Sequence, residues 1–224
     1  MNLLPRESIG LLTASGRKVF PFRDAAEIAP SICIEDIAHC LANQCRWMGA
    51  TKTFYSVAQH SLLVATVTDL RRGDPNDTLQ AHLHDAPEYL LLDLPSPLKH
   101  VDGGLDAYHF AHANLAHAIA IATGTPDPGP AVPGALPAMP AWLDVIDKEV
   151  GLAERWMLMP RVDENAAPPF DQDRLPDIVW TNLARPMPPL EARATFLTFY
   201  RSFKDLSLAS EKATAPSLSR TTPP

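Results

Sequence analysis

Histidines and carboxylates gather between Ser56 and Lys99 at spacings that suit a metal site. On a helix, His84 and Glu88 are four positions apart and share one face, and Asp85 lies one step round the same turn. One short helix can therefore offer an imidazole, a carboxylate for a metal and a second carboxylate left over. His60 lies too far upstream to share that helix, so it must come from another one.

Two further helices are expected to supply the remaining donors. Residues 56–72 place His60 on an apolar line, where a histidine is usually a core residue with a satisfied hydrogen bond. Residues 141–159 place Asp147 on a second apolar line. An aspartate on a buried helix line needs a partner, and a metal is one. A site fed by several helices is typical of the core of a helical bundle.

Apolar periodicity and turn residues predict an all-α chain. Two stretches rich in proline, residues 123–141 and 160–188, interrupt the helices and are interpreted as surface loops. Near the N-terminus, a Ser-Gly turn followed by Val19 and Phe20 predicts a short strand or hairpin. The expected helices are 33–47, 56–72, 78–93, 105–122, 141–159 and 189–206.

Arg46 and Trp47 close the first expected helix just before Gly49. An arginine in that place serves either as a partner for the helix dipole or as a fork that grips phosphate or sugar oxygens. The spacing leaves both roles open.

The segment DLPSPLKH follows the expected helix 78–93 and should be an extended loop stiffened by two prolines. It would present Asp93 and Lys99 at a rim. Pro87 lies inside the expected helix and should bend it beside the histidine–aspartate pair.

The other histidines are not expected to bind the metal. His109 and His112 are three positions apart, but no carboxylate lies at a matching spacing beyond Asp102 and Asp106. His82 is two positions from His84 and points to roughly the opposite face, so we interpret it as solvated or structural. Three histidines of the expected helix 105–122 are interpreted as surface residues: His109, His112 and His117.

Composition limits the classes of partner. The 224 residues carry a net charge of −7, which argues against binding of nucleic acid through its phosphate backbone. No apolar run of about 20 residues is present, so we expect no membrane span. The three cysteines show no CxxC spacing and are interpreted as buried residues of a reducing compartment. A cytoplasmic protein is expected.

The combined string RW…SVAQHSLLVA…HLHDAPEYLLLDLPSPLK resembles the HD-domain metal-dependent phosphohydrolases, in the branch of bacterial 5′-deoxynucleotidases and phage deoxynucleoside triphosphate (dATP) triphosphohydrolases. The resemblance covers about residues 30–160. It implies a single HD-domain helical bundle with a short N-terminal β arm and Pro-rich surface loops. We expect an arm over 1–30, the HD domain over 31–206 and a disordered tail over 207–224.

The resemblance implies that one divalent metal is held by His60, His84, Asp85 and Asp147. Two imidazoles and two carboxylates suit a transition metal better than a calcium cage. The expected cofactor is therefore one ion of cobalt, manganese, zinc or iron, with magnesium as an alternative.

The remaining matched residues are implied to face the substrate. Glu88 matches the carboxylate that handles the attacking water, and Asp93 matches an aspartate near the sugar and that water. Arg46 and Trp47 match a pair that contacts the nucleotide and favours a 2′-deoxy sugar. Lys99 matches a lysine that contacts phosphate.

The expected activity is metal-dependent cleavage of the α-phosphate ester of a 2′-deoxynucleotide, a small molecule, with release of the nucleoside. The motifs do not decide between a monophosphate and a triphosphate. Two alternatives stay open: a phosphodiesterase acting on cyclic nucleotides or dinucleotides, and a non-catalytic helical module. Exposed apolar helix faces also predict a homo-oligomer.

Overall fold

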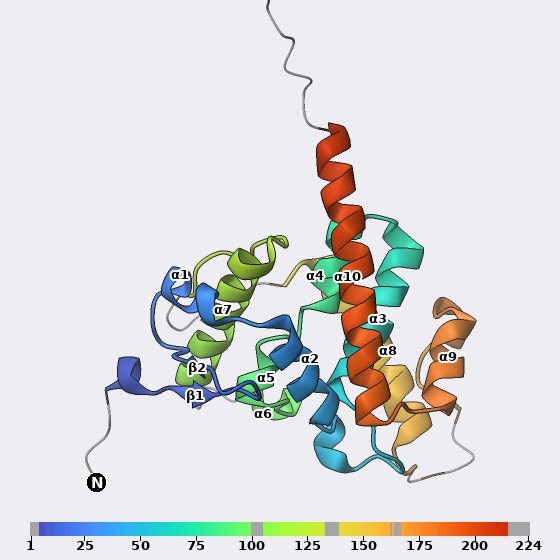
Figure 1. Ribbon diagram of the computed structural model, residues 1–224. Coiled ribbons are helices and arrows are strands. Elements are labelled where there is room, and N and C mark those ends of the chain that lie inside the picture. Colours follow the sequence, from blue (N-terminus) through green and yellow to red (C-terminus); the bar gives the residue numbers. More distant parts are fainter. Residues whose placement is uncertain (1–4, 100–104, 133–138, 162, 164–166, 215–224) are drawn as a thin grey trace, which may run out of the picture.

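The chain folds into helices, with one two-stranded antiparallel sheet among the described residues (Figure 1). The computed structural model describes residues 5–99, 105–132, 139–161, 163 and 167–214. The strands are β1 (Leu11–Leu12) and β2 (Lys18–Val19). The α-helices are α1 (Ala25–Ile28), α2 (Ile34–Asn43), α3 (Val57–Arg72), α4 (Pro75–His82), α5 (Glu88–Leu91), α6 (Ser96–Lys99), α7 (Asp106–Thr123), α8 (Ala141–Leu158), α9 (Asp177–Ala184) and α10 (Pro189–Thr214). The 3₁₀ turns are η1 (Arg6–Ser8), η2 (Ala29–Ser31), η3 (Trp47–Gly49) and η4 (Gln172–Arg174). The expected all-α fold with a short N-terminal β arm is confirmed.

Helix α3 lies at the centre of the fold and contacts α2, α4, α8 and α10. It begins where the Ser56 hydroxyl accepts a hydrogen bond from the Gln59 amide, and it ends at Gly73, whose φ of 67° a residue with a Cβ rarely adopts. Because neighbours surround α3, even its polar Gln59, His60 and Ser61 are fully buried.

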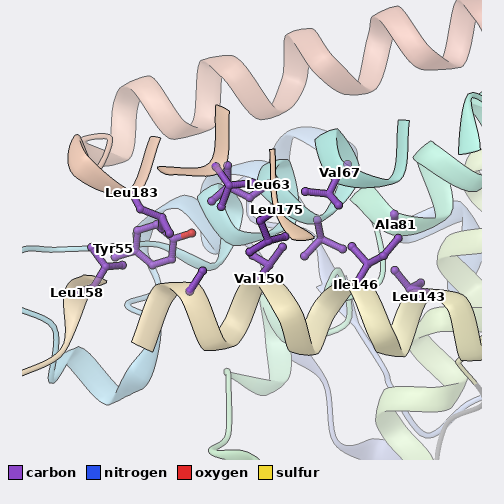
Figure 2. Packing of buried hydrophobic residues seen from close by; sticks show 14 residues of the cluster. Tyr55, Leu63, Val67, Ala81, Leu143, Ile146, Val150, Leu158, Leu175 and Leu183 are labelled. Carbon is purple, nitrogen blue, oxygen red and sulfur yellow. The ribbon is translucent and has the colours of Figure 1, made fainter. Parts of the chain in front are cut away.

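Two apolar clusters fix the helices around α3. Figure 2 shows the first cluster, in which Leu63 and Val67 of α3 pack against Ile146 and Val150 of α8. The second cluster joins α2 to α10, the long helix that stands upright between α2 and α9 in Figure 1. Phe196 is the largest of its side chains that are fully buried. The helices that carry the candidate metal donors are thus held by packing on several sides.

Several expected boundaries are wrong. The expected helix 78–93 is split, because α4 ends at His82, a turn covers 83–87, and α5 begins at Glu88 directly after Pro87. Pro87 has no N–H to bond the carbonyl four residues earlier, so a continuous helix would lose that bond and meet a steric clash. His84 and Asp85 therefore lie in the turn rather than on one helix with Glu88.

Other departures concern the ends of helices. The expected helix 33–47 corresponds to α2, which ends at Asn43, so Arg46 and Trp47 lie beyond it. The tail expected to be disordered over 207–224 is helical as far as Thr214, since α10 continues to that residue, and 215–224 lie outside the described residues. The stretch 160–188 contains α9 and η4 as well as loops.

The cysteines also differ from expectation, since Cys33 and Cys40 are half-buried and Cys45 is exposed. His82 takes the structural alternative: it is fully buried beside the Phe196 ring, and its Nε2 lies 3.2 Å from the Phe196 carbonyl oxygen. Burial lowers the pKa of His82 to about 3, so this imidazole is neutral.

The part of the chain that the structure describes has no helix of the length and apolarity needed to span a bilayer.

The N-terminal arm is tied to the helices by buried polar groups. The two strands pair with Leu11 opposite Val19. Asp36 of α2 is buried and accepts hydrogen bonds from the backbone N–H and the hydroxyl of Ser15, at 2.8 and 2.7 Å. Asn114 of α7 donates to the carbonyl oxygens of Pro21 and Arg23. The arm is therefore part of the packed structure.

Replacing Asp36 by alanine is expected to lower the free energy of unfolding by about 1–3 kcal/mol, because two donors of Ser15 lose their acceptor. Urea unfolding followed by circular dichroism measures this difference. The matched control is Glu35→Ala on the same helix, whose exposed carboxylate pairs with Arg201 and should change stability by less than about 0.5 kcal/mol. Equal losses in both variants would contradict anchoring of the arm through Asp36.

Candidate metal centre and active site

The four expected metal donors come from three separate parts of the fold and lie together. His60 projects from α3, His84 and Asp85 from the turn between α4 and α5, and Asp147 from α8. The Nε2 atoms of the two histidines are 3.3 Å apart, and Asp85 Oδ2 lies 3.4 Å from His60 Nε2 and 3.3 Å from His84 Nε2. Asp147 Oδ1 lies 2.9 and 3.7 Å from the same two nitrogens.

These separations fit donors that share one ion. Bonds from zinc to nitrogen or oxygen are about 2.0–2.1 Å long, so donors arranged tetrahedrally around it lie about 3.4 Å from one another. His60, His84 and Asp85 form a group whose ligand atoms all lie within 4.8 Å of one another. A small divalent cation thus matches both the donor types and the spacing of the cluster.

Both histidines are oriented with Nε2 toward the shared centre. His84 Nδ1 lies 2.7 Å from the carbonyl oxygen of Ala81, which can only accept, so Nδ1 carries the proton. His60 Nδ1 lies 2.7 Å from Oε1 of the buried Glu154 carboxylate. Binding of one ring nitrogen to a carbonyl or carboxylate leaves the other nitrogen as a metal ligand, and this is the usual support of metal-binding histidines.

The charge of the cluster also favours a cation. Burial and the nearby Arg46 would lower the pKa of His60, but Glu154 and Asp147 outweigh them and raise it to about 10. Without a metal the cluster therefore holds a proton on His60. Burial would raise the pKa of Asp85, yet the two histidines and Arg46 lower it to about 2. Asp85 is consequently ionised and available as a ligand.

Glu88 lies at the start of α5 and is fully buried. Its Oε1 accepts a hydrogen bond from Lys99 Nζ at 2.6 Å, and its Oε2 has no hydrogen-bond partner among the described residues. Burial and the neighbouring Asp85 raise the pKa of Glu88 well above its usual value, although Lys99 opposes this. A carboxyl group with a raised pKa and a free oxygen is suited to accepting a proton from water.

Arg46 is fixed among three carboxylates. Its backbone N–H donates to the Tyr55 carbonyl, which holds it beside the start of α3. Its Nε lies 2.9 Å from Glu154 Oε2, and one terminal nitrogen lies 3.5 Å from Asp85 Oδ2 and 3.7 Å from Asp93 Oδ2. The structure therefore places Arg46 and Asp93 beside the metal cluster, and the Nζ of Lys99 lies 3.9 Å from Asp93 Oδ1.

Backbone strain is concentrated at this site. Among the described residues, the non-glycine residues with positive φ are Trp47 (56°), Met48 (54°) and Leu92 (69°). Trp47 and Met48 directly follow Arg46, and Leu92 directly precedes Asp93. Each such residue costs on the order of 1–3 kcal/mol and persists only where surrounding contacts fix it. The strained positions thus hold the side chains expected to face the substrate.

Helix α7 contacts α5, and its His109 and His112 are not the surface residues that were expected. His109 Nε2 and His112 Nδ1 are buried and have no hydrogen-bond partner among the described residues. Burial and the charge of Lys99 lower the pKa of His112 to about 4, so its ring is neutral. Tyr108 donates to the carbonyl oxygen of Leu92 and so ties α7 to the strained residue. Only His117 matches the expectation, since it pairs with Asp127 at the surface.

Glu154 is the residue that the sequence interpretation missed. It lies two helical turns after Asp147 on α8, and it also accepts hydrogen bonds from Arg46, Trp47 and Tyr55. The available signal was its spacing, because positions 147 and 154 share one face of a helix. Burial would raise the pKa of Glu154, but His60 and Arg46 lower it to about 2, so the carboxylate is ionised.

Comparison with known proteins gives similarity without a described activity. No family model matches the chain. A segment is 46% identical over 92 residues to an uncharacterized protein of Rhodobacter capsulatus. The match covers 38% of this chain and 44% of that protein. Another match is 42% identical over 69 residues to the uncharacterized protein YfdR of Escherichia coli, covering 30% of this chain and 35% of that protein. The chain thus spans less than half the length of the curated relatives it matches.

Proposed function

We propose that the protein is a metal-dependent phosphohydrolase of the HD-domain type, which cleaves the α-phosphate ester of a 2′-deoxynucleotide and releases the nucleoside. The observation that carries the proposal is the pair of Nε2 atoms 3.3 Å apart, each on a ring whose Nδ1 is held by an oxygen, with Asp85 and Asp147 beside them. Two histidines and two carboxylates with open positions are suited to hydrolysis rather than to structural metal binding.

A divalent metal bound by these donors would supply Lewis acidity, which polarises a phosphate oxygen and lowers the pKa of water. Glu88 accepts the proton of the attacking water through its free Oε2. The water oxygen bonds to the α-phosphorus and the bond from phosphorus to the 5′ oxygen breaks. That oxygen takes a proton from solvent and leaves as the hydroxyl of the nucleoside, and Glu88 returns its own proton to solvent. Arg46 and Lys99 offset the charge of the phosphate.

The roles proposed for Arg46, Trp47 and Asp93 follow from where these residues lie relative to the metal cluster. Arg46 lies between Asp85 and Asp93, so it can bridge the reacting phosphate and the sugar. Trp47 lies next to it, with the guanidinium carbon 5.9 Å from the ring centroid. We propose that Arg46, Trp47 and Asp93 contact the nucleoside part and that Lys99 contacts phosphate. A pocket fitted to the 2′ carbon would exclude a hydroxyl there.

Location and assembly belong to the same proposal. We propose a cytoplasmic protein, because its three cysteines are unpaired. A homo-oligomer is proposed as well, because apolar side chains such as Leu190 and Leu206 of α10 are exposed. Light scattering coupled to size-exclusion chromatography gives the number of chains.

The deciding experiment is a panel of deoxynucleoside mono-, di- and triphosphates, with the matching ribonucleotides, assayed with Co²⁺, Mn²⁺, Zn²⁺, Fe²⁺ and Mg²⁺. Phosphate, pyrophosphate and triphosphate are quantified separately, because the inorganic product identifies the leaving group. We expect nucleoside release that a chelator abolishes and a preference for the deoxy series. Inactivity across the panel, with one metal bound per chain, would contradict the proposal and favour a non-catalytic module. Two metals per chain and cleavage of cyclic nucleotides would favour a phosphodiesterase.

A further inference from the structure

Glu154 connects two groups of residues that the proposed function treats separately. The residue lies on α8 and is fully buried. Its Oε1 faces the metal cluster, with His60 Nδ1 at 2.7 Å and the Tyr55 hydroxyl at 2.8 Å. Its Oε2 faces the substrate side, with Arg46 Nε at 2.9 Å and Trp47 Nε1 at 3.2 Å.

Glu154 accepts in the contacts with Arg46, Trp47 and Tyr55, and it accepts in the fourth when His60 Nδ1 carries a proton. Arginine and the indole N–H can only donate, and the Tyr55 hydroxyl donates in this arrangement. An ionised carboxylate has two acceptor oxygens and meets all four donors. A glutamine would turn an NH₂ group toward two of them, so one side of the arrangement would be left without an acceptor.

Each side has a distinct consequence. On the metal side, the bond to Nδ1 fixes the ring orientation and leaves Nε2 as the nitrogen that can bind a metal once its proton is displaced. On the substrate side, the bonds to Oε2 hold Arg46 toward Asp85 and hold the strained Trp47 in place. One buried group therefore contacts both sides, which allows a shift on one side to reach the other.

We propose that Glu154 is a positioning residue that couples metal binding at His60 to the placement of Arg46 and Trp47. The inference rests on the proposed function in naming one side the metal side and the other the substrate side. The coupling itself concerns only the metal cluster and the Arg46–Trp47 pair. Because coupling between two sites is reciprocal, a nucleotide held by Arg46 and Trp47 should also tighten metal binding.

The test compares Glu154→Gln with Glu149→Gln, a matched control on the same helix whose carboxylate pairs with Arg71 and Arg174 at 2.6 and 2.8 Å. Apo protein is titrated with Co²⁺ alone and followed by the visible absorption of the ion. With Zn²⁺ alone, the indole N–H resonance of Trp47, assigned by its loss in Trp47→Phe, is followed by NMR.

Glu154→Gln is expected to weaken metal affinity by about 10–100-fold, and the Trp47 resonance should no longer respond to Zn²⁺. Glu149→Gln should match the wild type in both measurements. If Glu154→Gln does not fold, Tyr55→Phe keeps the carboxylate and removes one donor to Oε1, and it should weaken metal affinity by several-fold.

Unchanged metal affinity in a folded Glu154→Gln protein would overturn the coupling, as would a wild-type Trp47 resonance that ignores Zn²⁺. If Glu154→Gln does not fold, unchanged metal affinity in Tyr55→Phe would overturn it too.

Failure of the coupling and failure of the proposed function give different results. If the wild type hydrolyses deoxynucleotides and Glu154→Gln keeps the wild-type metal affinity, only the coupling is contradicted. If the wild type hydrolyses no nucleotide of the panel and Glu154→Gln binds metal more weakly, only the proposed hydrolase activity is contradicted.

Discussion

Replacing Glu88 by glutamine is expected to lower kcat by about 10²–10⁴-fold while the protein keeps its metal. Glutamine preserves the shape of the buried side chain and an oxygen for Lys99, but it cannot take a proton from water. The loss should appear in kcat and kcat/KM alike, because the missing step is proton transfer and not binding. Steady-state kinetics on the best deoxynucleotide of the panel gives both constants.

Metal content separates this effect from damage to the cluster. Elemental analysis of the Glu88→Gln protein should give the wild-type metal stoichiometry, because Glu88 is not among the four donors. The matched control is Lys99→Gln, which removes the ion-pair partner and keeps the carboxylate, and its loss should be smaller and fall partly on KM. A Glu88→Gln protein with wild-type kcat would remove Glu88 from the mechanism.

The helices were predicted from the sequence because they depend on local periodicity, whereas the full set of proposed metal donors came from the resemblance to a family. The periodic apolar line of 56–72 predicted α3 to within one residue and placed His60 on its buried side. Asp147 stood out because a charged residue on an apolar line needs a partner. The structure brings these two residues together at 2.9 Å.

The features that periodicity does not record were missed. Pro87 was expected only to bend one helix, but the helix is split there, and His84 and Asp85 lie in a turn. The positive φ of Leu92 depends on distant contacts, such as that with Tyr108, and a leucine in the sequence does not predict it. Glu154 reads as an ordinary charged helix residue until its four donors, which come from elsewhere in the chain, are placed around it. Long-range contacts decide these features, so a one-dimensional pattern does not predict them.

Replacing Asp147 by alanine is expected to weaken metal binding by at least about 100-fold, beyond the 10–100-fold that changes in outer-shell residues cause. Asp147 Oδ1 is the donor nearest to His60 Nε2 and the only one supplied by α8. Its loss leaves three donors and removes one of the negative charges that attract a cation. Activity at limiting metal should fall to the level seen with chelator.

Thermal unfolding with added Co²⁺ or Zn²⁺ measures the Asp147→Ala effect without an assay of turnover. A ligand at 100 times its Kd stabilises the folded wild type by about 2.7 kcal/mol, and the same concentration should leave the Asp147→Ala melting temperature nearly unchanged. The control is Asp144→Ala on the same helix, whose exposed carboxylate pairs with Lys148, and it should keep the full metal-induced shift. If Asp147→Ala also keeps that shift, then His60, His84 and Asp85 hold the metal without it, because no other change separates the two variants. The fourth position would then belong to water or substrate, and α8 would serve the site through Glu154 alone.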